Sequence, residues 1–132
     1  MQCPRCKDEM REHSVEDINM HECPTCRSMW FGHGKLETVK DGVLPEMAWL
    51  DIDNWVDQAD FDAHIGDRIC PQCHDVFMTT VQDRQSVTTF DSCPQCSGIW
   101  LPGGQFLVLI NALLDEAHRK TVPEYARISL QK

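Results

Sequence analysis

The fold depends on Cys70-Pro71-Gln72-Cys73, which is followed along the chain by a second such turn, Cys93-Pro94-Gln95-Cys96. An earlier copy pairs Cys3-Pro4-Arg5-Cys6 with Cys23-Pro24-Thr25-Cys26. Two residues between cysteines let one tight turn aim both sulfurs at a single point, and proline fixes φ after the first cysteine. A second turn, brought back by a hairpin, completes a tetrahedral set of four sulfurs, which is the geometry that zinc accepts most readily. The sequence therefore predicts two metal sites.

All eight cysteines of the 132-residue chain belong to these four turns. We expect two Zn²⁺ ions per chain and no catalytic residues. The predicted ligand sets are Cys3, Cys6, Cys23 and Cys26, and Cys70, Cys73, Cys93 and Cys96. Disulfide bonds are the alternative, but no leader with a charged and an apolar part precedes Cys3. A reducing, cytoplasmic setting is the expectation, and there such cysteine pairs bind metal more often than they cross-link.

The composition also bears on partners. The formal net charge is −9, and two zinc ions on eight thiolates would bring it to about −13. Such a surface repels nucleic acid, so nucleic-acid binding stays open but is disfavoured. We expect instead a protein partner that offers a basic surface or a hydrophobic groove. No apolar run approaches the roughly 18 residues of a membrane span, so no membrane contact is expected.

The two cysteine-rich regions are copies of one unit. Beyond the ligands, Trp30 matches Trp100 and Gly34 matches Gly104 at similar offsets. Between the two turns of each copy, the sequence is typical of a β-hairpin, and each tryptophan is expected to pack over its own hairpin. Modules this small bury little apolar surface and need a metal to fold. The predicted fold class is small metal-stabilised α+β: two tandem zinc ribbons of the rubredoxin-like knuckle-and-hairpin kind, joined by an acidic helical segment and followed by a C-terminal helix.

The segment that joins the ribbons is acidic but not a flexible linker. We expect ribbons over 1–40 and 68–104 and a connecting segment over 41–67. Asp41-Gly42 should stop a short helix that begins at Lys35. The connecting segment has no lysine or arginine, yet it carries apolar residues at helical spacing, which predicts an acidic amphipathic helix packed on the structure. These residues are Ala48, Ile52, Trp55, Val56 and Ala59. Its acidic face is either solvated or docks a basic partner.

A stronger helical pattern covers 105–120. Phe106, Ile110 and Leu113 share one face, while Leu107 and Leu109 widen the apolar surface beyond what one ribbon can cover. Either the connecting segment packs on this helix, or a second copy of the chain does, as a homodimer through 105–120. The tail over 121–132 is left open between a docked strand and a frayed end.

The order of these motifs resembles the transcription-factor-type zinc ribbons, the TFIIB-like zinc-finger family. The matching runs are Cys23-Pro24-Thr25-Cys26-Arg27-Ser28-Met29-Trp30-Phe31 and Cys93-Pro94-Gln95-Cys96-Ser97-Gly98-Ile99-Trp100-Leu101. The family typically continues with an acidic residue and then Gly-Glu-Leu, from which this chain departs at Gly32, Lys35, Pro102 and Gln105. The resemblance implies a zinc ribbon with an interaction role. It leaves open a role in transcription, because the family label describes a fold.

The metal sites bear on four possible functions: an enzyme, an electron carrier, an adaptor between proteins and a nucleic-acid-binding protein. Four cysteines per metal leave no open coordination position, so an enzyme is not expected. His21 and His74 lie near the ligands, but the cysteine sets are already complete, so both are expected to be supporting or surface residues. A rubredoxin-like iron electron carrier usually has glycine after the second cysteine of each pair, where this chain has Lys7, Arg27, His74 and Ser97. We therefore predict a zinc-binding adaptor between proteins, with nucleic-acid binding and iron-based electron transfer as alternatives.

Overall fold

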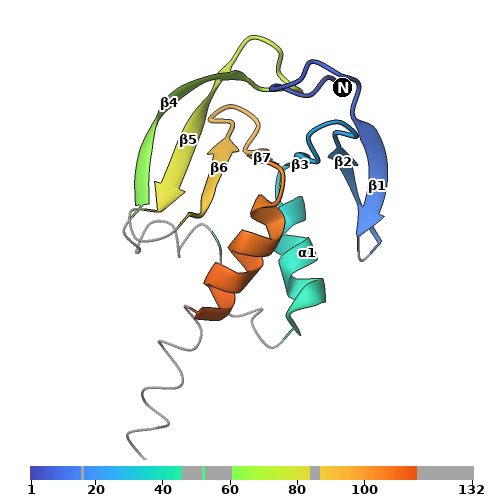
Figure 1. The fold of residues 1–132 in the computed structure, drawn as a ribbon, viewed down its shortest axis with the longest axis vertical. Helices are drawn as coiled ribbons and strands as arrows, with labels where there is room; N and C mark the ends of the chain where they lie inside the picture. Colours follow the sequence, from blue (N-terminus) through green and yellow to red (C-terminus); the bar gives the residue numbers. More distant parts are fainter. Residues whose placement is uncertain (16, 46–51, 53–60, 84–86, 116–132) are drawn as a thin grey trace, which may run out of the picture.

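One antiparallel sheet runs through both cysteine-rich regions. The computed structural model describes residues 1–15, 17–45, 52, 61–83 and 87–115. In this part of the chain, seven strands follow one another in the order β1-β2-β3-β7-β6-β5-β4 (Figure 1). The strands are β1 (Arg11–Val15), β2 (Ile18–Glu22), β3 (Met29–Phe31), β4 (Phe61–Ile69), β5 (Phe77–Asp83), β6 (Thr89–Ser92) and β7 (Ile99–Leu101).

Each cysteine-rich region forms the predicted knuckle-and-hairpin unit. In the first, the hairpin of β1 and β2 connects the two turns, and β3 follows the second turn. In the second, β5 and β6 form the hairpin and β7 follows. The prediction of two tandem zinc ribbons in a small α+β chain is therefore confirmed.

The two ribbons are joined edge to edge, which the sequence did not indicate. Strands β3 and β7 pair antiparallel, with Trp30 opposite Trp100 and Met29 opposite Leu101. Phe31 lies opposite Ile99, so exchange of the two copies leaves the register unchanged. The pairing therefore has a local two-fold symmetry at the tryptophan pair, like the interface of a symmetric dimer within one chain.

The two faces of this sheet carry two different cores. Because successive side chains of a strand point to opposite faces, Trp30 and Trp100 lie on one face while Phe31 and Leu101 lie on the other. The tryptophans are 1% and 0% exposed and pack with the cysteines and with Met78. Each tryptophan thus belongs to a core that both ribbons share, rather than only to its own hairpin.

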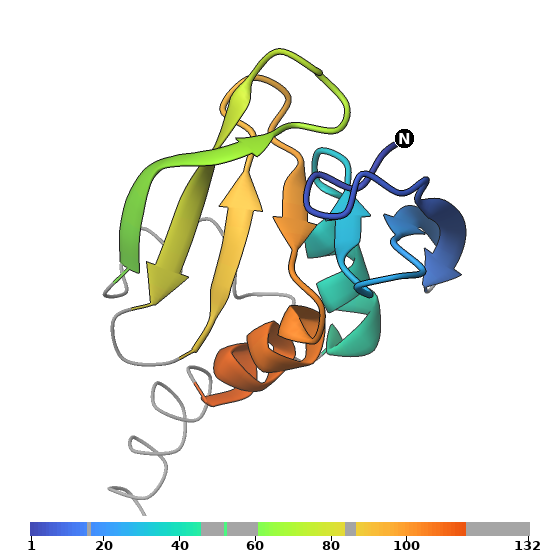
Figure 2. The ribbon, with the colours of Figure 1, turned by 45° about the horizontal axis from the view of Figure 1, so that its top comes forward.

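The second face is covered by two helices, which lie side by side beneath the sheet in both views (Figures 1 and 2). They are α1 (Lys35–Val43) and a helix whose described residues are 105–115. Leu109 and Leu113 are fully buried in this core, and the ring of Phe106 stacks on that of Phe31 with the centroids 6.0 Å apart. In the described ranges, neither helix has the length and hydropathy needed to cross a bilayer.

The described part of the predicted 105–120 helix therefore buries its apolar face within the chain. Leu107 is the large exception, with 68% of its surface exposed. The face that suggested a homodimer through 105–120 is largely occupied by the chain's own core. Residues 116–120 and the 121–132 tail lie outside the described residues.

This packing predicts a large difference between two leucines of one helix. Leu113→Ala should lower the free energy of unfolding by about 3 kcal/mol, because it leaves a cavity in the core. The matched control Leu107→Ala should change it by less than about 0.5 kcal/mol, since that side chain is mostly in water. Denaturant unfolding of the metal-loaded proteins measures both. Equal losses would show that this helix does not pack as described.

Helix α1 continues past the expected stop at Asp41-Gly42 and ends at Val43. Lys40, which is fully buried, forms ion pairs with Glu37 at 2.8 Å and with Asp41 at 3.0 Å. The N–H of Leu44 then donates to the carbonyl of Lys40 at 2.7 Å. These contacts outweigh the cost of about 1 kcal/mol for a glycine within a helix.

The end of the connecting segment is a strand rather than the predicted helix. Residues 61–67 belong to β4, which pairs antiparallel with β5. Phe61 packs against the helix-side core, whereas the next four residues are exposed, as suits a strand at the edge of the sheet. Within 46–60 the structure describes Ile52 alone, which is helical and 3% exposed. The rest of the predicted acidic helix lies outside the described residues.

Candidate metal centres

Each pair of cysteines lies on a tight turn, and in three of the four turns backbone amides point at the sulfur of the first cysteine. The N–H groups of Arg5 and Cys6 donate to Sγ of Cys3 at 3.4 and 3.3 Å. Cys73 and Cys96 donate in the same way within their own turns, at 3.3 and 3.4 Å. Because such hydrogen bonds favour the charged form of the acceptor, these turns are suited to hold thiolates.

The residue after each second cysteine closes the turn in a left-handed conformation. The φ angles of Lys7, Arg27, His74 and Ser97 are 66°, 65°, 71° and 62°. Each of the four donates its N–H to the carbonyl of the first cysteine of its turn, at 2.9 to 3.0 Å. This is the conformation that glycine adopts most easily, and another residue pays roughly 1–2 kcal/mol for it. The turn therefore has the same conformation without glycine at these positions. The absence of glycine does not distinguish a zinc site from an iron site.

The eight predicted ligands come together in two groups of four. Within each group the four sulfur atoms lie within 4.8 Å of one another. The Sγ atoms of Cys3 and Cys26 are 3.7 Å apart, and those of Cys73 and Cys93 are 3.8 Å apart. Four sulfurs at Zn–S distances of about 2.3 Å in a tetrahedron would be separated by about 3.8 Å. Each group therefore fits one metal ion.

Disulfides do not form in this arrangement. All eight cysteines are free thiols, and the sulfur separations are far above the roughly 2.05 Å of a disulfide bond. In each turn the first cysteine is buried and the second is partly exposed. A metal ion held by four such sulfurs would have no open position for a substrate or water.

In each cysteine group, burial and neighbouring groups shift the pKa of individual thiols from its ordinary value. A hydrogen bond with Cys26 raises the pKa of Cys6 to about 12, and burial raises the pKa of Cys73 to about 11. Burial also acts to raise the pKa of Cys26, but hydrogen bonds with Ser28 outweigh it and bring this pKa down to about 7. Because thiolates bind the metal, loading either site releases protons.

The two metal centres differ in the polar groups beside their tryptophans. In the second ribbon, Asp91 lies opposite Trp100 and is 1% exposed. Its carboxylate accepts hydrogen bonds from Thr80 Oγ1 at 3.0 Å and from Arg68 at 3.5 Å. The Arg68 guanidinium also lies over the Trp100 ring, 4.8 Å from the centroid. Burial raises the pKa of Asp91, while the contacts with Thr80 and Arg68 act in the opposite direction.

In the first ribbon, His21 takes the place of Asp91, since it lies opposite Trp30. Burial lowers the pKa of His21. It is a neighbour of the sulfur cluster and not part of it, as expected from the complete cysteine set. Arg68, Asp91 and the difference between the two ribbons were not predicted from the sequence. The repeat itself held the signal, because His21 and Asp91 are matching positions with unlike chemistry.

Removing Arg68 should therefore weaken the second ribbon. Arg68→Ala leaves the buried Asp91 carboxylate without its cation and uncovers Trp100, so we expect a loss of about 2 kcal/mol in unfolding free energy. Arg27→Ala is the matched control, because Arg27 pairs with Glu22 at 3.5 Å on the surface. That loss should stay below about 0.5 kcal/mol. A similar loss in both variants, measured by denaturant unfolding, would contradict this role of Arg68.

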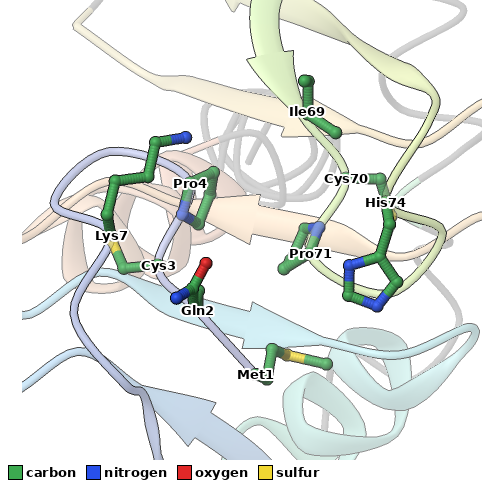
Figure 3. Close-up of a pocket in the computed structure, with 9 residues that line it drawn as sticks. All are labelled: Met1, Gln2, Cys3, Pro4, Lys7, Ile69, Cys70, Pro71 and His74. Carbon is green, nitrogen blue, oxygen red and sulfur yellow. The ribbon is translucent and has the colours of Figure 1, made fainter.

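A groove opens where the first turn of one ribbon faces the first turn of the other (Figure 3). Its volume is about 330 Å³. Lys7 and His74 lie on opposite sides of it, and none of the described residues that line it carries a carboxylate side chain. The lining residues are Met1, Gln2, Cys3, Pro4 and Lys7 of the first ribbon, and Ile69, Cys70, Pro71 and His74 of the second. The groove exists only because both ribbons share one sheet.

Comparison with known proteins agrees with this geometry. The profile of the family described as transcription factor zinc-finger, the TFIIB-type zinc ribbon, matches residues 2–42 and 69–112 in two separate segments. The chain belongs to the transcription factor zinc-finger family. The two matches cover both cysteine groups together with most of α1 and most of the described C-terminal helix, so each family unit includes a ribbon and much of the helix that follows it. No curated protein and no solved structure matches the chain significantly.

Proposed function

We propose that this zinc-finger protein holds two structural zinc ions and acts as a protein–protein interaction module. The observation that supports this best is the groove between the two ribbons, which lies beside closed metal centres and not at an open one. The metals would hold the walls of the groove in place, because Cys3 and Cys70 are both metal-site residues and lining residues. Chemistry at the metal is not part of the proposal.

The groove has the character of a peptide-docking surface. Pro4 and Pro71 form rigid parts of its wall, and Ile69 adds an apolar side chain that is 37% exposed. Next to it, Phe77 lies opposite Ile69 in the β4–β5 ladder and is 53% exposed. Exposed apolar groups that continue from a groove are typical of interaction sites. The net charge of −9 would attract a basic partner protein to the molecule as a whole.

The interaction can be tested with variants of the groove. Metal-loaded wild-type protein is used as bait beside Ile69→Glu and the control Val87→Glu, which alters an exposed apolar residue outside the groove. We expect wild type and the control to retain the same partner protein, and Ile69→Glu to lose at least about tenfold in affinity. Equal binding by all three baits would contradict the groove as the docking surface. A retained fraction that disappears after nuclease treatment would contradict a protein partner.

Nucleic-acid binding and iron are the competing functions, and each has a separate test. Binding to DNA or RNA should weaken steeply as salt rises, in proportion to the phosphates contacted, so a salt titration identifies it. Elemental analysis of protein expressed without added metal should find two zinc ions per chain. A red, iron-loaded protein would favour electron transfer instead.

A further inference from the structure

We propose that two copies of the chain pair through the outer edge of β4, antiparallel and centred on Ala63, to form one continuous sheet. Strand β4 ends the sheet, and among the described residues no strand lies beyond it. It has no counterpart in the first ribbon, where β1 is the last strand and is equivalent to β5. The interaction adds a partner that the proposed function does not include.

The part of β4 that can accept another strand is its first half. From Phe61 to Ile65 the strand pairs with β5 in a regular register, residue by residue. Between Ile65 and Ile69 the register shifts, and Gly66 packs closely against Thr80 there. Such irregularities bend a strand and obstruct edge pairing. The regular edge is therefore five residues long.

These five residues are complementary to themselves. In an antiparallel pair centred on Ala63, Phe61 lies opposite Ile65 of the second copy, and Asp62 lies opposite its His64. Because the pair has two-fold symmetry, each of these contacts occurs twice in the dimer. Apolar pairs and pairs of opposite charge are the cross-strand neighbours that stabilise an antiparallel ladder.

Exposure points to the same stretch. Ile65 is 78% exposed, more than any other large apolar residue that the structure describes. It lies opposite Thr79, and Ala63 lies opposite Val81, whose side chain belongs to the helix-side core. Phe61 packs at the margin of that core. In the paired form, Ile65 of the second copy would therefore cover Phe61 and extend the core across the interface.

The opposite edge of the sheet lacks this complementarity. Strand β1 presents exposed Arg11 and Glu12. Pairing of two copies about His13 would set two imidazoles opposite each other and Arg11 opposite Val15. Charged groups of this kind protect an edge from association. The dimer therefore forms through β4.

The interface is small, so the dimer is expected to be weak and reversible. Five residues from each copy bury less than the roughly 1,200 Å² of a standard interface. We expect dissociation constants of about 10–100 µM. Sedimentation velocity of the metal-loaded chain, from about 5 to 500 µM, should show the mass rise from 15.2 kDa toward twice that value.

Two sets of variants test the β4 contact. Ile65→Lys should weaken dimerisation at least about tenfold, whereas Val87→Lys, which changes a residue that is 73% exposed elsewhere, should leave it unchanged. His64→Asp places a carboxylate opposite Asp62 and should weaken the dimer, and adding Asp62→His should restore it. Circular dichroism and thermal melting check that each variant stays folded.

Several outcomes would overturn this interface. The interface is contradicted if the wild-type chain stays monomeric over the whole range of concentrations. It is also contradicted if the Ile65→Lys variant is folded and dimerises like the wild type. Dimerisation that is lost in Leu107→Lys but kept in Ile65→Lys would place the contact on the C-terminal helix instead.

Discussion

Removal of both metals is expected to unfold the sheet. Structural zinc contributes roughly 10–16 kcal/mol of binding free energy in small zinc domains, against a total stability of about 5–15 kcal/mol for a typical folded domain. Here the sulfur clusters lie in the same core as Trp30 and Trp100, which join the two ribbons. Chelation should therefore remove most of the β-sheet circular dichroism and shift the fluorescence of both tryptophans to that of water-exposed indole.

The joined sheet makes this loss cooperative. Cys6→Ser and Cys73→Ser each remove one ligand of one site, and we expect either change to lower the melting temperature of the whole chain and not of one ribbon alone. Trp49→Phe with Trp55→Phe removes the other two tryptophans, so that the signal reports on Trp30 and Trp100. Zinc-saturated chelator is the control. Unchanged spectra after elemental analysis confirms metal loss would show that the metals do not hold the fold.

The sequence was sufficient for the parts of the fold that depend on local spacing. Two cysteines with two residues between them can form only a few kinds of turn. The sulfur atoms of Cys70 and Cys73 therefore point at one site whatever surrounds them. The hairpins follow from β-branched runs around polar turns, and the helix over 105–115 follows from the spacing of Phe106 and Leu113. Each of these signals lies within about twenty residues of the chain.

The union of the two ribbons could not be predicted in the same way. Strands β3 and β7 have three residues each, which is too short for a period to be seen. Their pairing joins residues that are far apart in the sequence, and it depends on the shape of both ribbons. The sequence did contain a repeat with one tryptophan in each copy. Two equivalent residues of this kind can lie opposite each other when the two copies are related by a two-fold axis, as Trp30 and Trp100 do.

The error at β4 has a different origin. The apolar residues at helical spacing earlier in the connecting segment predicted an acidic amphipathic helix packed on the structure. That interpretation concealed the alternation of Phe61, Ala63 and Ile65 with Asp62 and His64. Alternation over five residues is typical of an edge strand. Its partner β5 was needed to choose between the two interpretations, because the segment is polar enough for either.

Two glycines of the second ribbon make the close approach of the ribbons possible. A Cβ atom at Gly98 would overlap the ring of Trp30, and one at Gly103 would overlap the carbonyl oxygen of Cys26. Both neighbours belong to the first ribbon. The matching positions of the first ribbon are Ser28 and His33, so the glycines are needed on one side of the joint only. The sequence repeat showed this difference, but its meaning required the paired structure.

Replacing both glycines should therefore separate the ribbons. We expect Gly98→Ala with Gly103→Ala to lower the free energy of unfolding by about 5 kcal/mol, because each added methyl group meets a ring or a backbone that cannot move away without breaking the β3–β7 ladder. Gly32→Ala is the matched control, since its Cβ would meet only the Lys35 side chain at 3.7 Å. That change should cost less than about 0.5 kcal/mol.

The measurement must distinguish separated ribbons from a chain that no longer folds. Both metal sites lie within single ribbons, so the glycine variant should still bind two metals while its thermal unfolding splits into two steps. In nuclear Overhauser spectra, the cross-strand contacts between Trp30 and Trp100 should disappear, because these residues lie directly opposite each other only in the joined sheet. A variant that keeps these contacts and a single transition at the wild-type temperature would show that the ribbons tolerate the added methyl groups. The close packing inferred at Gly98 and Gly103 would then be wrong.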